Sequence, residues 1–567
     1  MGNSLLPLLA AQSGIWYAQK LAVGEPLFRP GEYLEIHGPV DTLAFRAALQ
    51  QAVDESETLR LKFLESADGP MQYVAPHVDA DVHVADLSAL PDPRTAAERW
   101  MNEDLGRVPD LLTERPFSFA LFRLSADRHL WYHGYHHIVM DGFGAALFAR
   151  RVAELYTAAV GGAAAAERRF GGIADLLLEE KEYDCSDRFG QDEEFWRRER
   201  DADPAREHGN WPPLAAASDF ERFTTTVPAD VAAALRTLSA DLDVSLSRLL
   251  IGLTGRHLQA TSGTRCAAME LPVTARTTPL ARSTPAMMMN GVPLTLTLPP
   301  GITLPELLRH TADRVRNVLP HQRFRGEFLR RAGGLRPVVN VMTFDYSLTF
   351  GGHPVTAHNI SKRRIEGLSI SAYTRTADGP LLVDFDVNRG LLEADEPAAQ
   401  PQRLVRVLEQ AAELAGTAEH TSFPVDGLDV LSAGERSLVL EDWNDTALAD
   451  AAGAGQVVER FEAWAARTPD AVAVSCGGRE LTYRELAADV DRLAGHLQAR
   501  GAGPERLVAV ALPRSPELLT ALLAVLKSGA AYVPVDPGYP AERIAGVLAD
   551  AAPHAVLTCR EVLDADT

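Results

Sequence analysis

The stretch that most constrains the fold begins at residue 129, where a strand, a polar loop and a helix follow one another directly. Residues 129–135 are rich in aromatic side chains and predict a strand, whereas residues 145–160 carry apolar side chains at helical spacing. The pair Gly161-Gly162 predicts the end of that helix. Polar residues are confined to the loop 136–144, and catalytic groups are common in loops held between rigid elements. We therefore expect this loop to carry the function.

Helix and strand signals alternate from the start of the chain. Asp41 can cap a helix whose apolar positions, Leu43 among them, fall on about one face. Leu59, Leu61 and Phe63 alternate with polar residues and predict a strand. This mixture predicts an α/β architecture.

Two linkers divide the chain. Its 567 residues predict several domains or lobes, at roughly 100–200 residues per domain. A polar stretch with prolines, residues 200–219, separates two large halves, and a stretch of small and acidic residues, 445–456, precedes a new apolar pattern. We expect one lobe over residues 1–200, a second over 201–444, a linker over 445–456 and a further domain over 457–567.

Composition excludes several kinds of partner. The formal net charge of −22 argues against nucleic acid and against an anionic membrane surface, since both attract basic patches. The sequence has neither a run of about 18 apolar residues nor a signal peptide. The four cysteines, at positions 185, 266, 476 and 559, stand far apart, as free thiols do in a reducing compartment. We expect a cytoplasmic protein that binds neither nucleic acid nor membranes.

The candidate loop contains the run His136-His137-Ile138-Val139-Met140-Asp141-Gly142. Adjacent residues of a strand point to opposite faces, so only one of the two histidines can face a given cleft. A neutral imidazole can accept a proton near neutral pH. Asp141 can fix the loop, and Gly142 permits a turn that a β-carbon would hinder. Two alternatives remain open from these residues: a purely structural histidine pair, or a metal site for which His133 is the nearest further histidine.

The loop resembles the HHxxxDG signature of the condensation-domain superfamily, which includes relatives of chloramphenicol acetyltransferase. Five other segments resemble the remaining motifs of that family in the correct order, and together they cover roughly residues 5–440. They are Ala11–Trp16, Glu57–Arg60 with Phe63, Asn290–Leu294, His321–Arg323 and Asn340–Tyr346.

This resemblance to condensation domains of nonribosomal peptide synthetases implies a fold and a site. The fold would be two chloramphenicol acetyltransferase-like lobes that form a V-shaped pseudo-dimer, with a tunnel between them. Two thioesters, carried on the phosphopantetheine arms of carrier proteins, would enter from opposite faces and meet at His137. Asp141 would pair with Arg276 of the second lobe, while His136 and Gly142 complete the motif. The tunnel candidates are Asn290, Asn340 and Ser369.

The implied reaction is attack by an α-amine on a thioester carbonyl. His137 could act as general base, or it could orient the amine and stabilise the intermediate by hydrogen bonding. An α-amino group has a reference pKa of about 7.7–8.0, so a strong base is not required. No serine or cysteine nucleophile with a partner base is evident in the sequence, which favours direct transfer over a covalent acyl-enzyme.

The segment after residue 456 resembles the start of an amino-acid adenylation domain. Residues 481–486 and 526–536 resemble its first two motifs, and Trp443–Thr446 resembles the junction with a condensation domain. The resemblance implies a partial α/β N-terminal subdomain. The phosphate loop and catalytic lysine of adenylating enzymes lie outside this sequence, and Lys527 belongs to the second motif. We therefore expect no bound cofactor and no amino-acid activation by this chain alone, since ATP and Mg²⁺ serve the complete adenylation domain.

Further resemblance concerns the donor. Gly31–Val40, Phe143 and Phe344–Tyr346 look like the opening domains of the enterobactin and bacillibactin synthetases, which make siderophores and accept 2,3-dihydroxybenzoate from a stand-alone carrier. This implies an upstream donor carrier that acts in trans, a downstream acceptor carrier domain and an aryl or other acyl donor. The basic run Lys362–Leu368 departs from their pattern and puts a catechol in doubt. Two rival functions are an epimerisation domain and a non-catalytic recruiting platform of the same fold.

Overall fold

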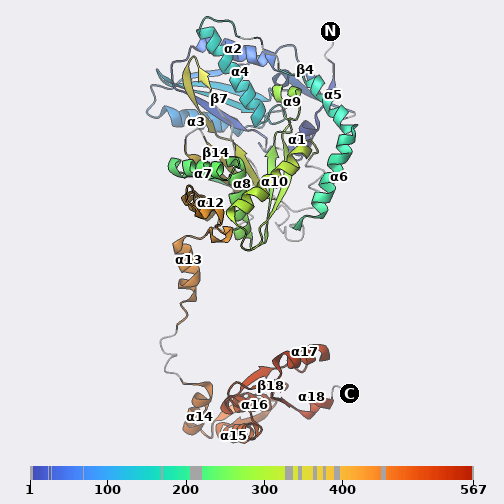
Figure 1. Cartoon of the computed structure of the whole chain (residues 1–567), viewed down its shortest axis with the longest axis vertical. Helices are drawn as coiled ribbons and strands as arrows, with labels where there is room; N and C mark the ends of the chain where they lie inside the picture. The colour runs from blue at the N-terminus through green and yellow to red at the C-terminus, as the bar shows by residue number, and fades with distance from the viewer. Residues whose placement is uncertain are drawn as a thin grey trace. The chain divides into compact units, whose positions relative to one another are not determined.

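In the computed structural model the chain forms two compact units, Met1–Arg436 and Ser437–Thr567 (Figure 1). No helix of the described residues is both long and apolar enough to cross a membrane. The described residues are 4–564 without 23, 27, 68, 166, 168–169, 205–219, 326–335, 343–347, 362–366, 375–378, 389–395 and 448–454.

The first lobe of the larger unit is built on a six-stranded sheet in the order β12-β13-β2-β7-β6-β5. All neighbouring strands are antiparallel except β5 and β6. Helices α2 and α4 pack on one face around Trp131, and α3 packs on the other around Tyr132. The elements are β2 (Gly31–Ile36), β5 (His83–Asp86), β6 (Phe117–Ser125), β7 (Arg128–Tyr135), β12 (Thr349–Phe350), β13 (His353–Asn359), α2 (Thr42–Glu55), α3 (Pro93–Leu105) and α4 (Gly142–Val160).

Two strands of this sheet, β12 and β13, come from the second half of the sequence. β13 pairs with β2 in register, from Val355 opposite Ile36 to Asn359 opposite Glu32. The first lobe therefore contains more than the residues 1–200 that the linker suggested, because residues 349–359 cross over to complete its sheet.

The second lobe also has a six-stranded sheet, in the order β10-β9-β11-β14-β15-β8. Helices α7, α8, α10 and α12 cover only one face of it, against Val383 and Phe385 of β15. Asp384 and Asp386 alternate with these residues and are buried on the opposite face. The elements are β8 (Phe220–Val227), β9 (Cys266–Val273), β10 (Asn290–Thr297), β11 (Val338–Met342), β14 (Leu368–Thr374), β15 (Leu381–Asn388), α7 (Ala229–Asp241), α8 (Leu246–Ser262), α9 (Pro279–Ser283), α10 (Leu304–Val318) and α12 (Glu396–Glu413).

The larger unit also contains two helices, α5 and α6, and a small sheet. Helix α6 follows α5 and lies along the second lobe, where the indole nitrogen of Trp196 donates to the carbonyl of His321 at 3.0 Å (Figure 1). A three-stranded sheet in the order β1-β4-β3 lies in the first lobe. These elements are β1 (Leu6–Pro7), β3 (Leu61–Ser66), β4 (Gly69–Val74), α1 (Ala10–Leu21), α5 (Ile173–Asp184) and α6 (Asp187–Asp201).

Local sequence signals explain several of these elements. Asp41 caps α2 by accepting hydrogen bonds from Leu43 and Ala44 at 2.9 and 3.0 Å. Leu43 does not share the buried apolar face of α2 with Phe45 and Leu49, because its side chain lies in the first turn and is 80% exposed. Leu59 is buried in a short 3₁₀ turn, and the strand begins at Leu61.

The smaller unit contains a parallel sheet in the order β19-β18-β20 and a two-stranded hairpin, β16-β17. Thr482 and Glu485 form a capping box that starts α15, and Lys527 forms ion pairs with Glu462 and Asp491. The elements are α13 (Ala433–Leu440) at the division between units, α14 (Val457–Arg467), β16 (Val472–Cys476), β17 (Arg479–Thr482), α15 (Tyr483–Ala499), β18 (Leu507–Ala511), α16 (Pro516–Lys527), β19 (Ala531–Pro534), α17 (Ala541–Ala551), β20 (Ala555–Thr558) and α18 (Arg560–Asp564).

Candidate functional site

The predicted strand, loop and helix are β7, residues 136–141 and α4. Backbone hydrogen bonds hold the loop at its start: His136 N–H donates to Pro116 at 2.6 Å and His137 N–H donates to Phe28 at 2.7 Å. At its end, the Asp141 carboxylate caps α4 by accepting from Gly144 N–H at 2.8 Å. The loop is therefore fixed from both sides, which pre-organises its side chains.

Other segments predicted from the family motifs support the same loop. The Gln12 side-chain amide donates to the carbonyl of Ile138 at 2.9 Å, in the middle of the loop. The Thr58 hydroxyl donates to Pro285, and the Gln322 side-chain oxygen accepts from Ala275 N–H at 3.0 Å. These contacts hold the neighbouring segment 275–285 of the second lobe, so the motifs act as a scaffold around the loop.

His136 points into the core of the first lobe. Its ring lies 6.2 Å from that of Phe28, and its Nδ1 accepts from Ile138 N–H at 3.2 Å. Burial lowers the pKa of His136 to about 3, so the ring is neutral near pH 7. The His136 ring is therefore part of the core and does not line the pocket.

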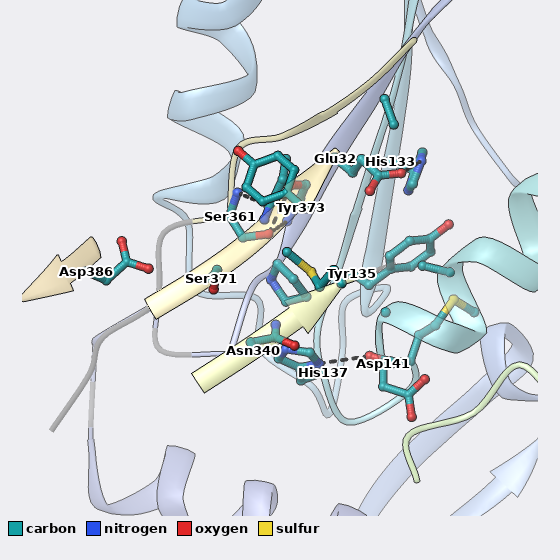
Figure 2. A pocket seen from close by; sticks show the side chains of 18 of the residues that line it. Glu32, His133, Tyr135, His137, Asp141, Asn340, Ser361, Ser371, Tyr373 and Asp386 are labelled. Carbon is teal, nitrogen blue, oxygen red and sulfur yellow. Dashed lines mark hydrogen bonds and ion pairs between the residues drawn. The ribbon is translucent and has the colours of Figure 1, made fainter. Parts of the chain in front are cut away.

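His137 lies on the opposite side and lines a pocket (Figure 2). Its Nδ1 donates to the carbonyl oxygen of Met140 at 3.0 Å, because a carbonyl can only accept. In the neutral ring this leaves the lone pair on Nε2. The loop thus fixes both the orientation and the tautomer of His137.

Asp141 and Arg276 are brought together although they are far apart in sequence. Arg276 Nη1 lies 2.7 Å from Asp141 Oδ2, and each side chain is 1% exposed. The same carboxylate oxygen accepts from the N–H groups of Met288 and Met289 at 3.0 and 2.9 Å. The Arg276 guanidinium also lies 4.7 Å from the ring of Phe143. Asp141 is thus committed to holding the start of α4 against the second lobe.

Both lobes contribute to the pocket that His137 lines. The first lobe provides residues of β2, β7, β13 and α4, and the second provides residues of β8, β11, β14 and β15. The lining residues are Pro30, Gly31, Glu32, His133, Tyr135, His137, Met140, Asp141, Gly142, Ala145, Arg222, Asn340, Met342, Ala357, Asn359, Ser361, Ser371, Tyr373, Thr374 and Asp386.

Of the three tunnel candidates, only Asn340 is among the residues that line this pocket. Asn290 instead donates to the carbonyls of Gln322 and Phe324 at 2.8 and 2.7 Å. Ser369 is buried two residues before Ser371, which does line the pocket. The motifs with Thr343–Tyr346 and Lys362–Glu366 lie outside the described residues.

The sequence reasoning missed the charged residues of the second lobe. Arg222 of β8 binds Asp386 of β15 at 2.6 Å, and the Tyr373 hydroxyl donates to Asp384 at 3.1 Å. Burial by itself would lower the pKa of Arg222, but the hydrogen bond to Asp386 and the charges of Asp386 and Asp384 outweigh it, so the pKa is raised above its ordinary value. The alternation of acidic and apolar residues along β15 was the available signal, since it marks a strand with one polar face.

Gly142 does not make the turn that the sequence suggested. It is the first residue of α4, and a β-carbon there would meet none of the described atoms within 4 Å. Its absent side chain instead leaves room in the pocket. The crowded position is Gly144, where a β-carbon would lie 3.1 Å from the backbone nitrogen of Ala286.

The alternative of a metal site at this loop gains no support. The residues that the structure describes contain no group of three or more His, Cys, Asp or Glu suited to a metal ion. His133, the nearest further histidine, is buried beside Glu32, with 3.5 Å between Nε2 and Oε1. What the site brings together is one oriented histidine, a tight ion pair between lobes and a pocket with polar walls.

Two protein-family models match the chain. The model described as "Condensation domain" matches residues 3–437, and the model described as "AMP-binding enzyme" matches residues 461–567.

Curated relatives match nearly the whole chain. A "Dimodular nonribosomal peptide synthase" of Bacillus subtilis is 36% identical over 98% of this chain, and an "Isonitrile lipopeptide synthase" of Streptomyces coeruleorubidus is 37% identical over 97%. "Enterobactin synthase component F" of Escherichia coli is 27% identical over 98%. The chain spans 23%, 37% and 43% of these three proteins respectively.

A solved structure shows the same fold. The starter condensation domain of rhizomide synthetase, crystallised as a variant with C8-CoA, superposes with a TM-score of 0.66 and 32% identity. The match covers 76% of this chain and 98% of that domain.

Proposed function

The chain belongs to the condensation-domain family of nonribosomal peptide synthetases, and from this premise we propose that it joins a carrier-bound acyl donor to the α-amine of a carrier-bound aminoacyl acceptor at His137. Domains of this family form amide bonds between carrier-bound substrates. The observation that carries the proposal is the position of His137, whose Nδ1 is held by Met140 while its ring lines a pocket between the lobes.

The proposed chemistry is direct transfer. The acceptor amine attacks the thioester carbonyl, and the tetrahedral intermediate collapses to the amide and the thiolate of the donor's phosphopantetheine arm. The proton lost by the amine is taken up by that thiolate. Nε2 of His137 can relay this proton as general base, or can hold the amine and the intermediate by hydrogen bonding.

The remaining motif residues have positioning roles in this proposal. Asp141 and Arg276 hold α4 and the second lobe together directly beside His137. A displacement of about 1 Å in a catalytic group can cost about 10²-fold in rate. His136 supports the same loop from inside the core.

Two observations support condensation over the rival functions. The AMP-binding match follows the condensation domain directly, whereas an epimerisation domain is not expected to lead into an adenylation domain. A recruiting platform without activity needs neither a tautomer-fixed histidine nor a pocket at its ring, and this chain has both.

The donor is proposed to be an acyl group that an upstream carrier protein supplies in trans, and the acceptor to be held on a downstream carrier domain. Relatives support this reading, since one is named a lipopeptide synthase and the solved neighbour is a starter condensation domain. The phosphopantetheine arms of the carriers deliver both substrates. ATP and Mg²⁺ are needed by a complete adenylation domain, not by this reaction.

The donor assignment is tested by loading aryl, fatty acyl and peptidyl groups onto an upstream carrier protein and following amide formation by mass spectrometry. We expect turnover with aryl or fatty acyl carriers, and none by the His137→Ala variant. Turnover with peptidyl donors alone would make this an ordinary elongation domain.

Gly142 and Gly144 offer a matched pair of variants. Gly142→Ala should leave the free energy of unfolding unchanged or higher, because alanine is the better helix former, yet it should slow amide formation by placing a methyl group in the pocket. Gly144→Ala should lower stability, because its β-carbon presses on the backbone of Ala286. Urea unfolding and turnover, measured side by side, check both. Full activity of Gly142→Ala would show that this glycine does not border the substrates.

A further inference from the structure

Three neighbouring strands of the first lobe place a row of polar residues in the pocket. Asn359 of β13 lies opposite Glu32 of β2, and Glu32 lies opposite His133 of β7. Tyr135 lies two residues further along β7, on the same face as His133. In Figure 2, Glu32 and His133 are seen at one end of the pocket and His137 at the other, with Tyr135 between them. The row therefore lines the pocket away from the reacting histidine.

Several polar atoms of this row have no hydrogen-bond partner among the described residues. The His133 side chain is 1% exposed, and neither ring nitrogen makes a hydrogen bond, although Nε2 lies 3.5 Å from Glu32 Oε1. The Tyr135 hydroxyl is also without a partner, in a residue that is 3% exposed. Buried polar groups are normally paired, so unpaired ones that border a pocket indicate a ligand that would complete them.

The charge state of the row restricts the ligand. Burial lowers the pKa of His133 to about 3 and raises the pKa of Tyr135, so both side chains are neutral near pH 7. Each of them can donate one hydrogen and accept another, whereas the Glu32 carboxylate only accepts. A carboxylate or phosphate on the ligand would be repelled by Glu32, and a plain hydrocarbon would give no hydrogen bond to the His133 ring nitrogens or to the Tyr135 hydroxyl. A hydroxyl group can donate to Glu32 and accept from Tyr135 or His133.

We propose that Glu32, His133 and Tyr135 form a specificity subsite that selects acyl donors bearing a hydroxyl group. The subsite rests on the proposed function, since the ligand is the donor whose carbonyl reacts beside His137. Next to the polar row the pocket is lined by small apolar residues such as Ala145 and Ala357, which leave room for the carbon skeleton. A hydroxylated aryl group and a hydroxylated alkyl chain share the required chemistry.

The test compares donors that differ by one hydroxyl. Benzoyl and 3-hydroxybenzoyl groups form one pair, and octanoyl and 3-hydroxyoctanoyl groups form the other, each loaded onto the same carrier protein. For the unmodified chain, kcat/KM should favour the hydroxylated member of at least one pair by about tenfold. The pair that shows the preference tells an aryl source from an alkyl source.

Substitutions of Tyr135 and Glu32 test whether the preference for hydroxylated donors arises from the polar row. Tyr135→Phe and Glu32→Gln should each lower kcat/KM for the hydroxylated donor by about 5- to 10-fold while leaving the unsubstituted donor unaffected or faster. A merely structural role would slow both donors equally. Tyr33→Phe is the matched control, because Tyr33 adjoins Glu32 on β2 but points to the other face, where its hydroxyl donates to Glu98 at 2.8 Å. This variant should keep the preference.

The outcomes separate the subsite from the function on which it rests. Equal use of both members of each pair, with amide formation intact, would overturn the subsite and leave the condensation activity standing. An unchanged preference in Tyr135→Phe, the most conservative variant, would also overturn it. If neither pair is turned over while a peptidyl donor is, both the subsite and the acyl-donor proposal fail.

Discussion

Replacement of His137 by alanine should lower the rate of amide formation by about 10²–10⁴-fold, which is the usual contribution of one positioned acid–base group. His137 lines the pocket with its Nδ1 bound by Met140, so its loss removes the group that the loop orients. The fold should survive, because the side chain is only partly buried and its hydrogen bond to Met140 stays within the loop.

Single-turnover assays with two loaded carriers measure this effect without interference from carrier recycling. His77→Ala is a suitable control, because this histidine is exposed on the surface and pairs with Asp54. It should retain full activity. Near-normal turnover by His137→Ala, with a normal melting temperature, would remove His137 from the mechanism.

Replacement of Asp141 by alanine should destabilise the larger unit by about 3–5 kcal/mol, because it leaves Arg276 buried without its anion. The same change removes the cap of α4 and the acceptor for Met288 and Met289. Activity should fall together with stability, since this contact joins the lobes next to His137.

Urea unfolding monitored by circular dichroism measures the loss. Combining Asp141→Ala with Arg276→Met should recover part of it, because the double variant no longer buries an uncompensated charge. Arg197→Ala breaks an exposed pair with Glu194 and should cost no more than about 1 kcal/mol. An Asp141→Ala variant that is fully stable but inactive would indicate that the carboxylate acts in catalysis directly.

The local part of the site was predictable from sequence. The periodicity of residues 129–160 predicts a strand and a helix, and the structure has β7 and α4 in those places. His136 and His137 lie on opposite sides, as expected, although β7 ends at Tyr135 and both histidines belong to the loop that follows it. These predictions hold because they depend on residues that are neighbours in the chain.

Long-range features needed more than sequence pattern. Asp141 and Arg276 are 135 residues apart, and only the family resemblance suggested their pairing. The errors at Leu43 and Gly142 have the same origin, since the burial of a side chain at a helix start depends on what packs against it. Glu32 and His133 become neighbours only through the register of β2 and β7, which no local signal specifies.

The crossing of β13 into the first sheet bears on attempts to exchange parts between synthetases. The stretch with prolines near residue 210 has the sequence of a linker between lobes, but dividing the chain there would separate β13 from its partner β2. The isolated first half would then expose the edge of β2, and such edges promote aggregation. A chimaera that takes its first lobe from one synthetase and its second lobe from another must therefore transplant residues 348–361 together with the first lobe, so that two segments of the chain are exchanged at once.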